Sequence, residues 1–238
     1  MSKVGKTILV ILGVFPFTAL LFFGSKLSFT EPNYSVSNAY YSIIDNKSSS
    51  SIDIYFNAEI ANPSNYVELL SFLKLYSGEK YIRIILNTPG GEFFAGAQII
   101  DAIRLARVPT VSEVNVLAAS MGGMFLLSTS LIDIPDHALL MFHNITSRDG
   151  RELPTYILRL FQDLFVSVAK GFLTAEEIDA VFNKQGQVWM SGKEAIKRAC
   201  KVNKLFGTKE YVTLKCTAAK TWPDEEVLFL PGPGVTSP

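Results

Sequence analysis

Residues 81–91 read YIRIILNTPGG, a mostly apolar strand pattern that runs directly into a proline and two glycines. A short buried strand that ends at such a breaker is typical of α/β domains. Residues 94–105 follow with a helical pattern that has apolar side chains on or near one face, and residues 110–116 return to a strand pattern. Strand, helix and strand at these lengths predict a crossover unit of a parallel sheet.

The same alternation extends outward on both sides of this stretch. Upstream, residues 52–56 form a β-branched and aromatic run and residues 66–76 an amphipathic stretch. Downstream lie two short apolar runs at residues 131–134 and 138–142, a long helical stretch at 154–170 and a capping-box pattern at 174–177. We therefore predict an α/β domain with a mainly parallel sheet over residues 52–213.

The composition excludes several classes of protein. The chain has 238 residues, of which 48% are hydrophobic and 18% charged, and its formal net charge is zero. It is long enough for one medium domain, and it has no basic surplus that would favour nucleic acid as a partner. Only two histidines and two cysteines are present, so neither a zinc site nor another metal or cofactor site is expected.

The first residues carry a candidate membrane segment. Lys3 and Lys6 precede an uncharged run over residues 8–24, whose 17 residues are at the lower limit for a helix that spans a bilayer. We interpret residues 1–26 as an N-terminal transmembrane anchor, with a cleaved secretory signal or a buried soluble helix as the alternatives. Because only Lys26 lies close after the run, the positive-inside bias predicts a single-pass protein whose domain faces the non-cytoplasmic side.

The segments that flank the domain have a different composition. Residues 27–51 are rich in Ser, Asn, Tyr and Asp and predict a linker, and residues 214–238 contain several prolines and predict an irregular tail. Cys200 and Cys216 form an even pair in an exported protein. Their spacing is compatible with a disulfide and equally with two ordinary buried thiols.

Two turns after strands carry small residues. In PGG at residues 89–91 the backbone is able to adopt conformations closed to other residues, and its N–H groups are able to donate to an oxyanion. AASMGG at residues 118–123 opens a helix, where unpaired N–H groups surround Ser120 with a positive field. Taken alone, the first is also an ordinary turn and the second an ordinary helix cap.

The two histidines differ in their surroundings. His143 ends the apolar run at residues 138–142, where an imidazole is either a hydrogen-bonded core residue or a base that serves the nearby serine. His137 follows a Pro-Asp turn and is interpreted as an exposed loop residue.

These three features, in this order, resemble the proteolytic subunits of Clp proteases. NTPGG at residues 87–91 is similar to the Asn-Ser-Pro-Gly-Gly turn of that family, AASMGG to its nucleophile segment, and LLMFHN at residues 139–144 to its Met-Ile-His segment. The 29 residues from Gly91 to Ser120 agree with the family spacing, and the 23 residues from Ser120 to His143 are slightly fewer. The resemblance covers about residues 52–204 and implies a ClpP/crotonase-like spiral of crossover β-α units.

The resemblance also implies a role for each matched residue. Ser120 would be the nucleophile, His143 the general base and then the general acid, and the backbone N–H groups of Gly91 and Met121 the oxyanion hole. It implies a serine-type endopeptidase that acts on peptides or proteins, and a homo-oligomeric ring. The ATP-driven unfoldase that feeds cytosolic family members is not expected on the non-cytoplasmic side of a membrane.

One position departs from the family pattern. Where the family has the acid of its triad, this chain has Gln187, in the stretch QVWMSGKEA. A neutral amide is able to orient an imidazole but provides no charge to stabilise the imidazolium, and such a change lowers kcat about 10⁴-fold in a well-studied triad. Three carboxylates are conceivable substitutes, namely Asp149, Asp163 and Asp179.

Three other functions compete with this interpretation. A catalytically weak or silent assembly subunit is favoured by Gln187. A membrane protease similar to signal-peptide peptidases would use a lysine base, but no lysine occurs between Ser120 and Lys170. An acyl-CoA enzyme of the crotonase type would need an oxyanion hole but no serine–histidine pair.

Overall fold

The computed structural model describes residues 35–147, 149, 151–183, 186–224 and 227–231. The predicted anchor at residues 1–26, with its apolar run at 8–24, lies outside these residues. Within the described ranges, none of the helices has the length and apolar character needed to cross a bilayer. The compact body of the chain is Tyr34–Pro238, and the description below concerns this unit alone.

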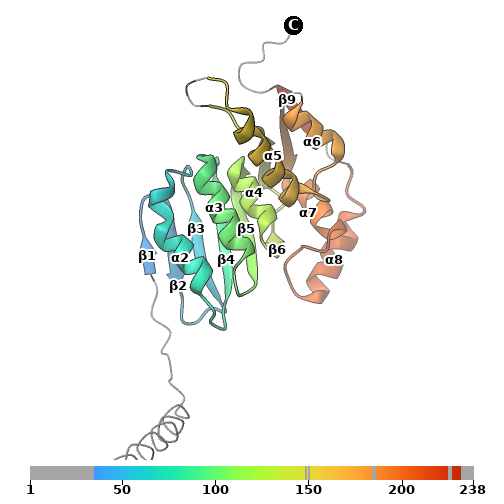
Figure 1. Ribbon diagram of the computed structural model, residues 1–238. Helices are drawn as coiled ribbons and strands as arrows, with labels where there is room; N and C mark the ends of the chain where they lie inside the picture. The colour runs from blue at the N-terminus through green and yellow to red at the C-terminus, as the bar shows by residue number, and fades with distance from the viewer. Residues whose placement is uncertain (1–34, 148, 150, 184–185, 225–226, 232–238) are drawn as a thin grey trace, which may run out of the picture. The chain divides into compact units, whose positions relative to one another are not determined.

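Strands and helices alternate along the chain as the sequence predicts (Figure 1). The strands are β1 (Ser35–Ser37), β2 (Ser42–Asp45), β3 (Ser51–Phe56), β4 (Tyr81–Thr88), β5 (Thr110–Ala119), β6 (Leu131–Asp133), β7 (Leu139–His143), β8 (Gly186–Ser191) and β9 (Leu228–Pro231). The helices are η1 (Pro63–Tyr66), α2 (Val67–Leu75), α3 (Phe93–Arg104), α4 (Met121–Ser128), α5 (Thr155–Ala169), α6 (Ala175–Phe182), α7 (Gly192–Lys201) and α8 (Lys209–Ala219).

The strands of the described residues form one sheet in the order β1-β2-β3-β4-β5-β7-β8-β9, with β6 also paired to β5. The pairs β3–β4, β4–β5, β5–β6 and β5–β7 are parallel. Antiparallel pairs flank this parallel centre on both sides, as β1–β2–β3 and as β7–β8–β9. The predicted α/β fold is confirmed, and its parallel part is the centre of the sheet, where the candidate site residues lie at the strand ends.

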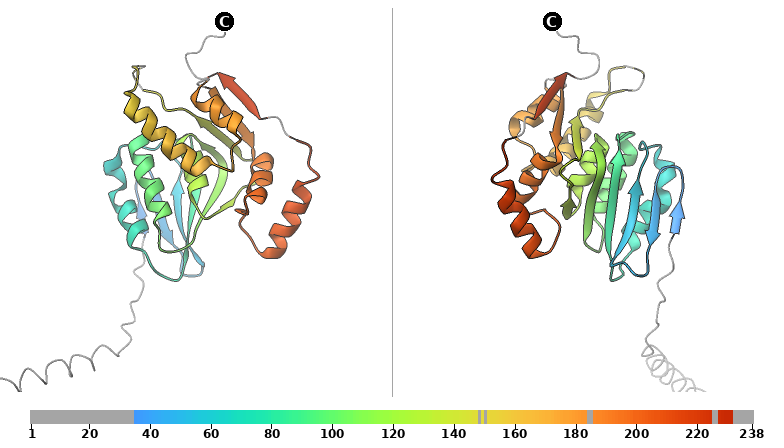
Figure 2. Two further views of the ribbon diagram at one scale, coloured as in Figure 1. Left: turned by 45° about the vertical axis from the view of Figure 1, so that its right-hand side comes forward. Right: turned by 180° about the vertical axis from the view of Figure 1, so that it is seen from behind.

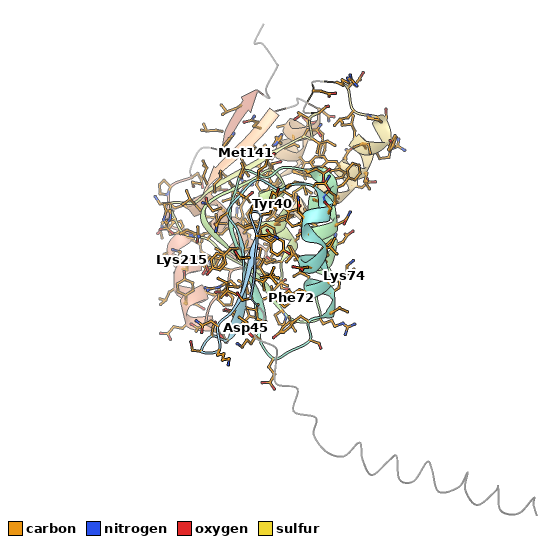
Figure 3. The ribbon with its side chains drawn as sticks, turned by 90° about the vertical axis from the view of Figure 1, so that its left-hand side faces the viewer. Tyr40, Asp45, Phe72, Lys74, Met141 and Lys215 are labelled. Atoms are coloured by element: carbon orange, nitrogen blue, oxygen red, sulfur yellow. A yellow bond between two sulfur atoms is a disulfide. The ribbon has the colours of Figure 1, made fainter. Side chains whose placement is uncertain are left out.

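Helices α2, α3 and α4 lie along one face of the sheet, while the view from behind presents the strands (Figure 2). Side chains of the helices fill the space against the strands. Figure 3 shows this for α2, where Phe72 lies toward the sheet and Lys74 on the outer side of the helix. Phe72 is buried because one face of this amphipathic helix packs on the core.

Helix α4 is the centre of the core. Its residues Met121 to Leu127 are all buried, so the helix is apolar on every side, as expected of an element enclosed by others. Phe125 contacts Phe56 of β3, with ring centroids 5.2 Å apart. Two glycines permit this enclosure: a Cβ on Gly122 would lie 2.7 Å from Thr88 Cγ2, and one on Gly123 would lie 2.8 Å from the Phe142 ring. The start of α4 is therefore fixed against β4 and β7.

The linker predicted over residues 27–51 is wrong for its described part. Residues 35–45 form β1 and β2, which pair in antiparallel fashion and extend the sheet through β3. The polar composition concealed two core side chains, Tyr41 and Ile43, whose exposed fractions are 3% and 0%. Tyr41 also packs on Tyr66, with ring centroids 5.7 Å apart. Burial of these side chains outweighs the low strand propensity of their serine-rich neighbours.

The irregular tail predicted over residues 214–238 is also wrong in part. Helix α8 continues to Ala219, and β9 pairs with β8. Helix α8 is held to α7 by a disulfide between Cys200 and Cys216, whose Cα atoms are 5.6 Å apart. Of the two states that the sequence left open for these cysteines, the structure has the disulfide.

Candidate active site

The turn after β4 is built around two glycines in backbone conformations that other residues rarely adopt. Gly90 has φ +93° and Gly91 has φ +145°. The turn is held by the neighbouring segment, because the Ile60 N–H donates to Gly90 O at 2.7 Å and the Glu92 N–H donates to Ile60 O at 2.8 Å. The N–H of Gly91 donates to no acceptor within the described ranges, so it is available to a ligand.

Thr88 fixes the same turn from within the sheet. Its side chain is fully buried, its hydroxyl donates to Ala58 O at 2.6 Å, and it accepts from the Gly90 N–H at 3.2 Å. No role for Thr88 is predicted from the sequence. Its place immediately before Pro-Gly-Gly, as a hydroxyl in a strand of apolar residues, was the available signal.

Ser120 occupies a strained turn between β5 and α4. Its φ is +54° and its ψ is −118°, and Asn203 is the other described residue besides glycine with positive φ. The Ser120 N–H donates to Met141 O of β7 at 2.8 Å, which ties the turn to the neighbouring strand. The hydroxyl does not cap α4, and the N–H of Met121 at the start of the helix has no acceptor among the residues described. Both are therefore free to act on a ligand.

The two turns touch each other. A Cβ on Gly90 would lie 2.6 Å from Ser120 Cβ, 2.7 Å from Ala119 O and 2.9 Å from Met121 N. The side chain of Met121 packs on Gly96 of α3 in the same way. The unpaired N–H groups of Gly91 and Met121 thus belong to two turns in van der Waals contact beside the Ser120 side chain.

His143 is the last residue of β7, two residues beyond Met141, which pairs with Ala119 of β5. Its side chain is half-buried, and burial lowers the pKa of the imidazole because it disfavours the charged form. A hydrogen bond with the backbone of Asn144 raises the pKa and partly offsets this effect. The ring is therefore neutral at neutral pH, as a general base must be.

The described side chains of Ser120 and His143 are not joined by a hydrogen bond. In free enzymes such bonds are often long and tighten only when substrate binds. The topology nevertheless brings the serine turn and the histidine to the ends of two adjacent strands, β5 and β7.

Gln187 lies directly opposite His143 in the antiparallel pair of β7 and β8. Residues opposite each other on neighbouring strands have Cβ atoms about 5 Å apart on the same face of the sheet. The Gln187 amide oxygen accepts a hydrogen bond of 2.9 Å from the indole N–H of Trp189, two residues further along β8. Trp189 belongs to the stretch that resembles the family pattern, and no role is predicted for it from the sequence.

The conceivable substitute acids have other surroundings. Asp149 is exposed, accepts from the Ser147 hydroxyl and pairs with Arg151 at 3.2 Å. Asp179 accepts from the Asn183 amide at 2.5 Å, and Asp163 lies on the exposed side of α5. None of these carboxylates is among the groups that shift the pKa of His143. Within the described residues, His143 therefore has no acidic partner.

Comparison with known proteins finds relatives of this chain. The family model described as Clp protease matches residues 36–151, which include Gly91, Ser120 and His143 but not Gln187. This match supports the assignment of the chain as a ClpP-like family member. This confirms the resemblance drawn from the three motifs, and the mixed α/β fold with its parallel centre fits a ClpP-like fold.

Among curated proteins, the ClpP-like chain is similar to proteolytic subunits of the ATP-dependent Clp protease. Subunit 1 of Chlamydia muridarum is 33% identical over 109 residues, which cover 42% of this chain and 55% of that protein. Subunit 1 of Chlamydia trachomatis serovar D is 31% identical over 109 residues, with the same coverage of 42% and 55%. Subunit 1 of Chlamydia abortus is 29% identical over 94 residues, which cover 39% and 49%. The chain thus spans about half the length of the curated relatives it matches.

Proposed function

We propose that this ClpP-like chain is a membrane-anchored serine endopeptidase. In this proposal the Ser120 hydroxyl attacks the carbonyl of a peptide bond while His143 accepts its proton, and His143 then returns the proton to the leaving amine. The N–H groups of Gly91 and Met121 donate to the oxyanion of the tetrahedral intermediate. Water repeats the sequence on the acyl-enzyme and releases the second product.

One observation carries the proposal: two backbone N–H groups without acceptors in the described chain lie in touching turns beside a serine whose backbone is strained. Gly91 is exposed and the Met121 N–H is among the first four of helix α4, so neither donor has to be paired within the protein and both are open to a ligand. Acyl transfer requires donors to the oxyanion beside the nucleophile, and in this proposal the two N–H groups supply them. The neutral imidazole at the end of the adjacent strand supplies the base.

The surface around His143 supports a polypeptide substrate. Alternate residues of β7, β8 and β9 share one face of the sheet. On the face of His143 this places Leu139, Leu228 and Leu230, whose exposed fractions are 40%, 48% and 45%, together with Met141, which Figure 3 labels. Exposed apolar side chains beside the site favour a substrate that carries apolar side chains of its own.

A lysine base is less well supported. Lys204 has a lowered pKa because it is buried, and Arg104 adds to the effect. Its ammonium, however, donates to Leu127 O at 2.8 Å and to Thr129 O at 3.1 Å, at the C-terminal end of α4. Ser120 is at the opposite end of that helix, about 10 Å away at 1.5 Å per residue. Lys204 is therefore too far from Ser120 to serve as its base.

A weak or silent assembly subunit is the second candidate function. The amide of Gln187 at the position of the family's acid favours it, since His143 has no carboxylate partner in the part of the chain described. Family members typically form oligomeric rings, and we propose a homo-oligomeric ring for this chain under either function. We further propose that residues 8–24 anchor the protein with its domain on the non-cytoplasmic side, where it cleaves peptides or loosely folded segments without an ATP-driven unfoldase.

Labelling with a fluorophosphonate probe tests the enzyme. We expect the purified full chain to be labelled at Ser120, and we expect labelling to vanish in Ser120→Ala and in His143→Ala. His137→Ala is the matched control, because His137 is exposed and its ring bonds the Asn115 backbone at 3.2 Å, away from Ser120 in the sequence pattern. Folded, oligomeric protein that resists the probe would favour the silent subunit.

The topology needs a separate measurement. Protease added to intact cells is expected to remove a tag at the carboxyl terminus if the domain faces outward. Protection of that tag until the membrane is permeabilised would overturn the proposed orientation, whatever the result of labelling.

A further inference from the structure

The hydrogen bond between Trp189 and Gln187 identifies the oxygen atom of the Gln187 side-chain amide. An indole N–H donates and never accepts, so the amide atom 2.9 Å from Trp189 Nε1 has to be the oxygen. Both side chains are half-buried on β8 and share one face of the sheet with His143. The only acceptor atom of the Gln187 side chain is therefore engaged by Trp189 along β8, and the described residues show no hydrogen bond between it and His143.

We infer that Trp189 is a positioning residue that keeps the acceptor oxygen of Gln187 turned away from His143. The reaction at Ser120 is thereby slower than the nucleophile, the base and the oxyanion donors would otherwise allow. The inference rests on the proposed serine peptidase. A general-base histidine needs an acceptor at the ring nitrogen that does not face the serine, since that acceptor selects the tautomer and stabilises the imidazolium. In this chain the side chain placed opposite His143 has its acceptor engaged elsewhere.

The titration of His143 agrees with this geometry. An oxygen that accepted from the ring would favour the imidazolium and raise the pKa. The contribution that raises the pKa of His143 comes from the backbone of Asn144, and the side chain of Gln187 does not contribute. Burial is the larger effect, and it lowers the pKa.

The test removes the indole donor with and without a carboxylate at position 187. Trp189→Phe keeps an aromatic ring but frees the Gln187 oxygen to turn toward His143. We expect the rate constant for fluorophosphonate labelling of Ser120 to rise about 3- to 10-fold, as one additional neutral hydrogen bond provides. We also expect the apparent pKa of the pH–rate profile to move upward.

Gln187→Glu supplies two acceptor oxygens, so that one is able to bind Trp189 while the other faces His143. We expect labelling of this variant to rise by about 10²-fold or more, part of the 10⁴ that an acid contributes in a well-studied triad. In the Gln187→Glu background the indole holds the carboxylate in place, so adding Trp189→Phe is expected to lower the rate. The effect of losing the indole thus changes sign between the two backgrounds.

A purely structural role for Trp189 would lower the rate in both backgrounds and leave the pH profile unmoved, and that result would overturn the inference. Trp222→Phe is the matched control, because Trp222 packs beside Lys215 of α8, and its labelling is expected to be unchanged. If Trp189→Phe does not fold, 3-benzothienylalanine at position 189 keeps the shape of the ring without its N–H. Absence of labelling in all of these proteins, Gln187→Glu included, would instead refute the proposed function, and the inference with it.

Discussion

Replacing Gly90 by alanine tests whether the two touching turns form one site. The new Cβ would lie 2.6 Å from Ser120 Cβ and 2.7 Å from Ala119 O, on a residue whose φ is +93°. Left-handed backbone costs a residue with a side chain about 1–2 kcal/mol, and overpacking typically costs about 1–3 kcal/mol more. Because backbone and the first atom of a side chain are not able to move aside cheaply, we expect the two turns to separate.

Separation of the turns would displace one of the two oxyanion donors from Ser120. Loss of one such donor costs about 10²- to 10³-fold in rate, so the labelling rate of Ser120 in Gly90→Ala is expected to fall by about 100-fold or more. The assay is fluorophosphonate labelling, followed with time on protein whose fold is verified by circular dichroism.

Gly171 provides a matched control for the backbone strain. Its φ is +87°, close to that of Gly90, but a Cβ there would meet only Val202 Cγ1, at 3.9 Å, in the turn after α5. Gly171→Ala is therefore expected to lose about 1–2 kcal/mol of stability and to keep its labelling rate. Labelling of Gly90→Ala at the rate of Gly171→Ala would show that contact between the turns has no part in the reaction.

Three further measurements follow from the described contacts. Replacing both Cys200 and Cys216 by serine removes the bridge across 16 positions and is expected to lower the free energy of unfolding by about 3 kcal/mol in urea titration; a change below 1 kcal/mol would contradict this. In the native protein the buried carboxylate of Glu177 lies 2.6 Å from the guanidinium of Arg198, and Arg198→Met leaves it without this partner. The free energy of unfolding is expected to fall by about 3–5 kcal/mol, measured by thermal unfolding, with a smaller loss in Glu177→Gln. Since burial holds the pKa of His143 below its ordinary 6.5, the unfolded chain takes up the proton first as the pH falls. Stability is then lost from about pH 6.5 downward, and the acid limb of the labelling profile is expected to have its midpoint below 6.5, with a midpoint above that value refuting the assignment.

The parallel centre of the fold and the turns of the candidate site were predictable because their signals are local. A strand pattern that ends in Pro89, Gly90 and Gly91 requires only its own residues to be recognised. The same holds for Ser120, since small residues on both sides of a strand-to-helix junction are visible without knowledge of the tertiary structure.

The parts that the sequence analysis missed depend on partners far away in the chain. β1 and β2 are serine-rich, and they become strands because Tyr41 and Ile43 find a core formed by residues further along. The bond from Trp189 to Gln187 depends on rotamers, and the place of Gln187 opposite His143 depends on the register of two strands more than 40 residues apart. The composition and the hydrophobic periodicity of the sequence contain no information on side-chain rotamers or on strand register.

The strained backbone of Ser120 lowers the stability of the protein at the residue that we propose as its nucleophile. Its φ of +54° costs a residue with a side chain about 1 kcal/mol that glycine would not lose. A change from serine to glycine would relieve this strain and remove the proposed nucleophile in one step. Glycine at this position would thus exchange the proposed nucleophile for backbone freedom.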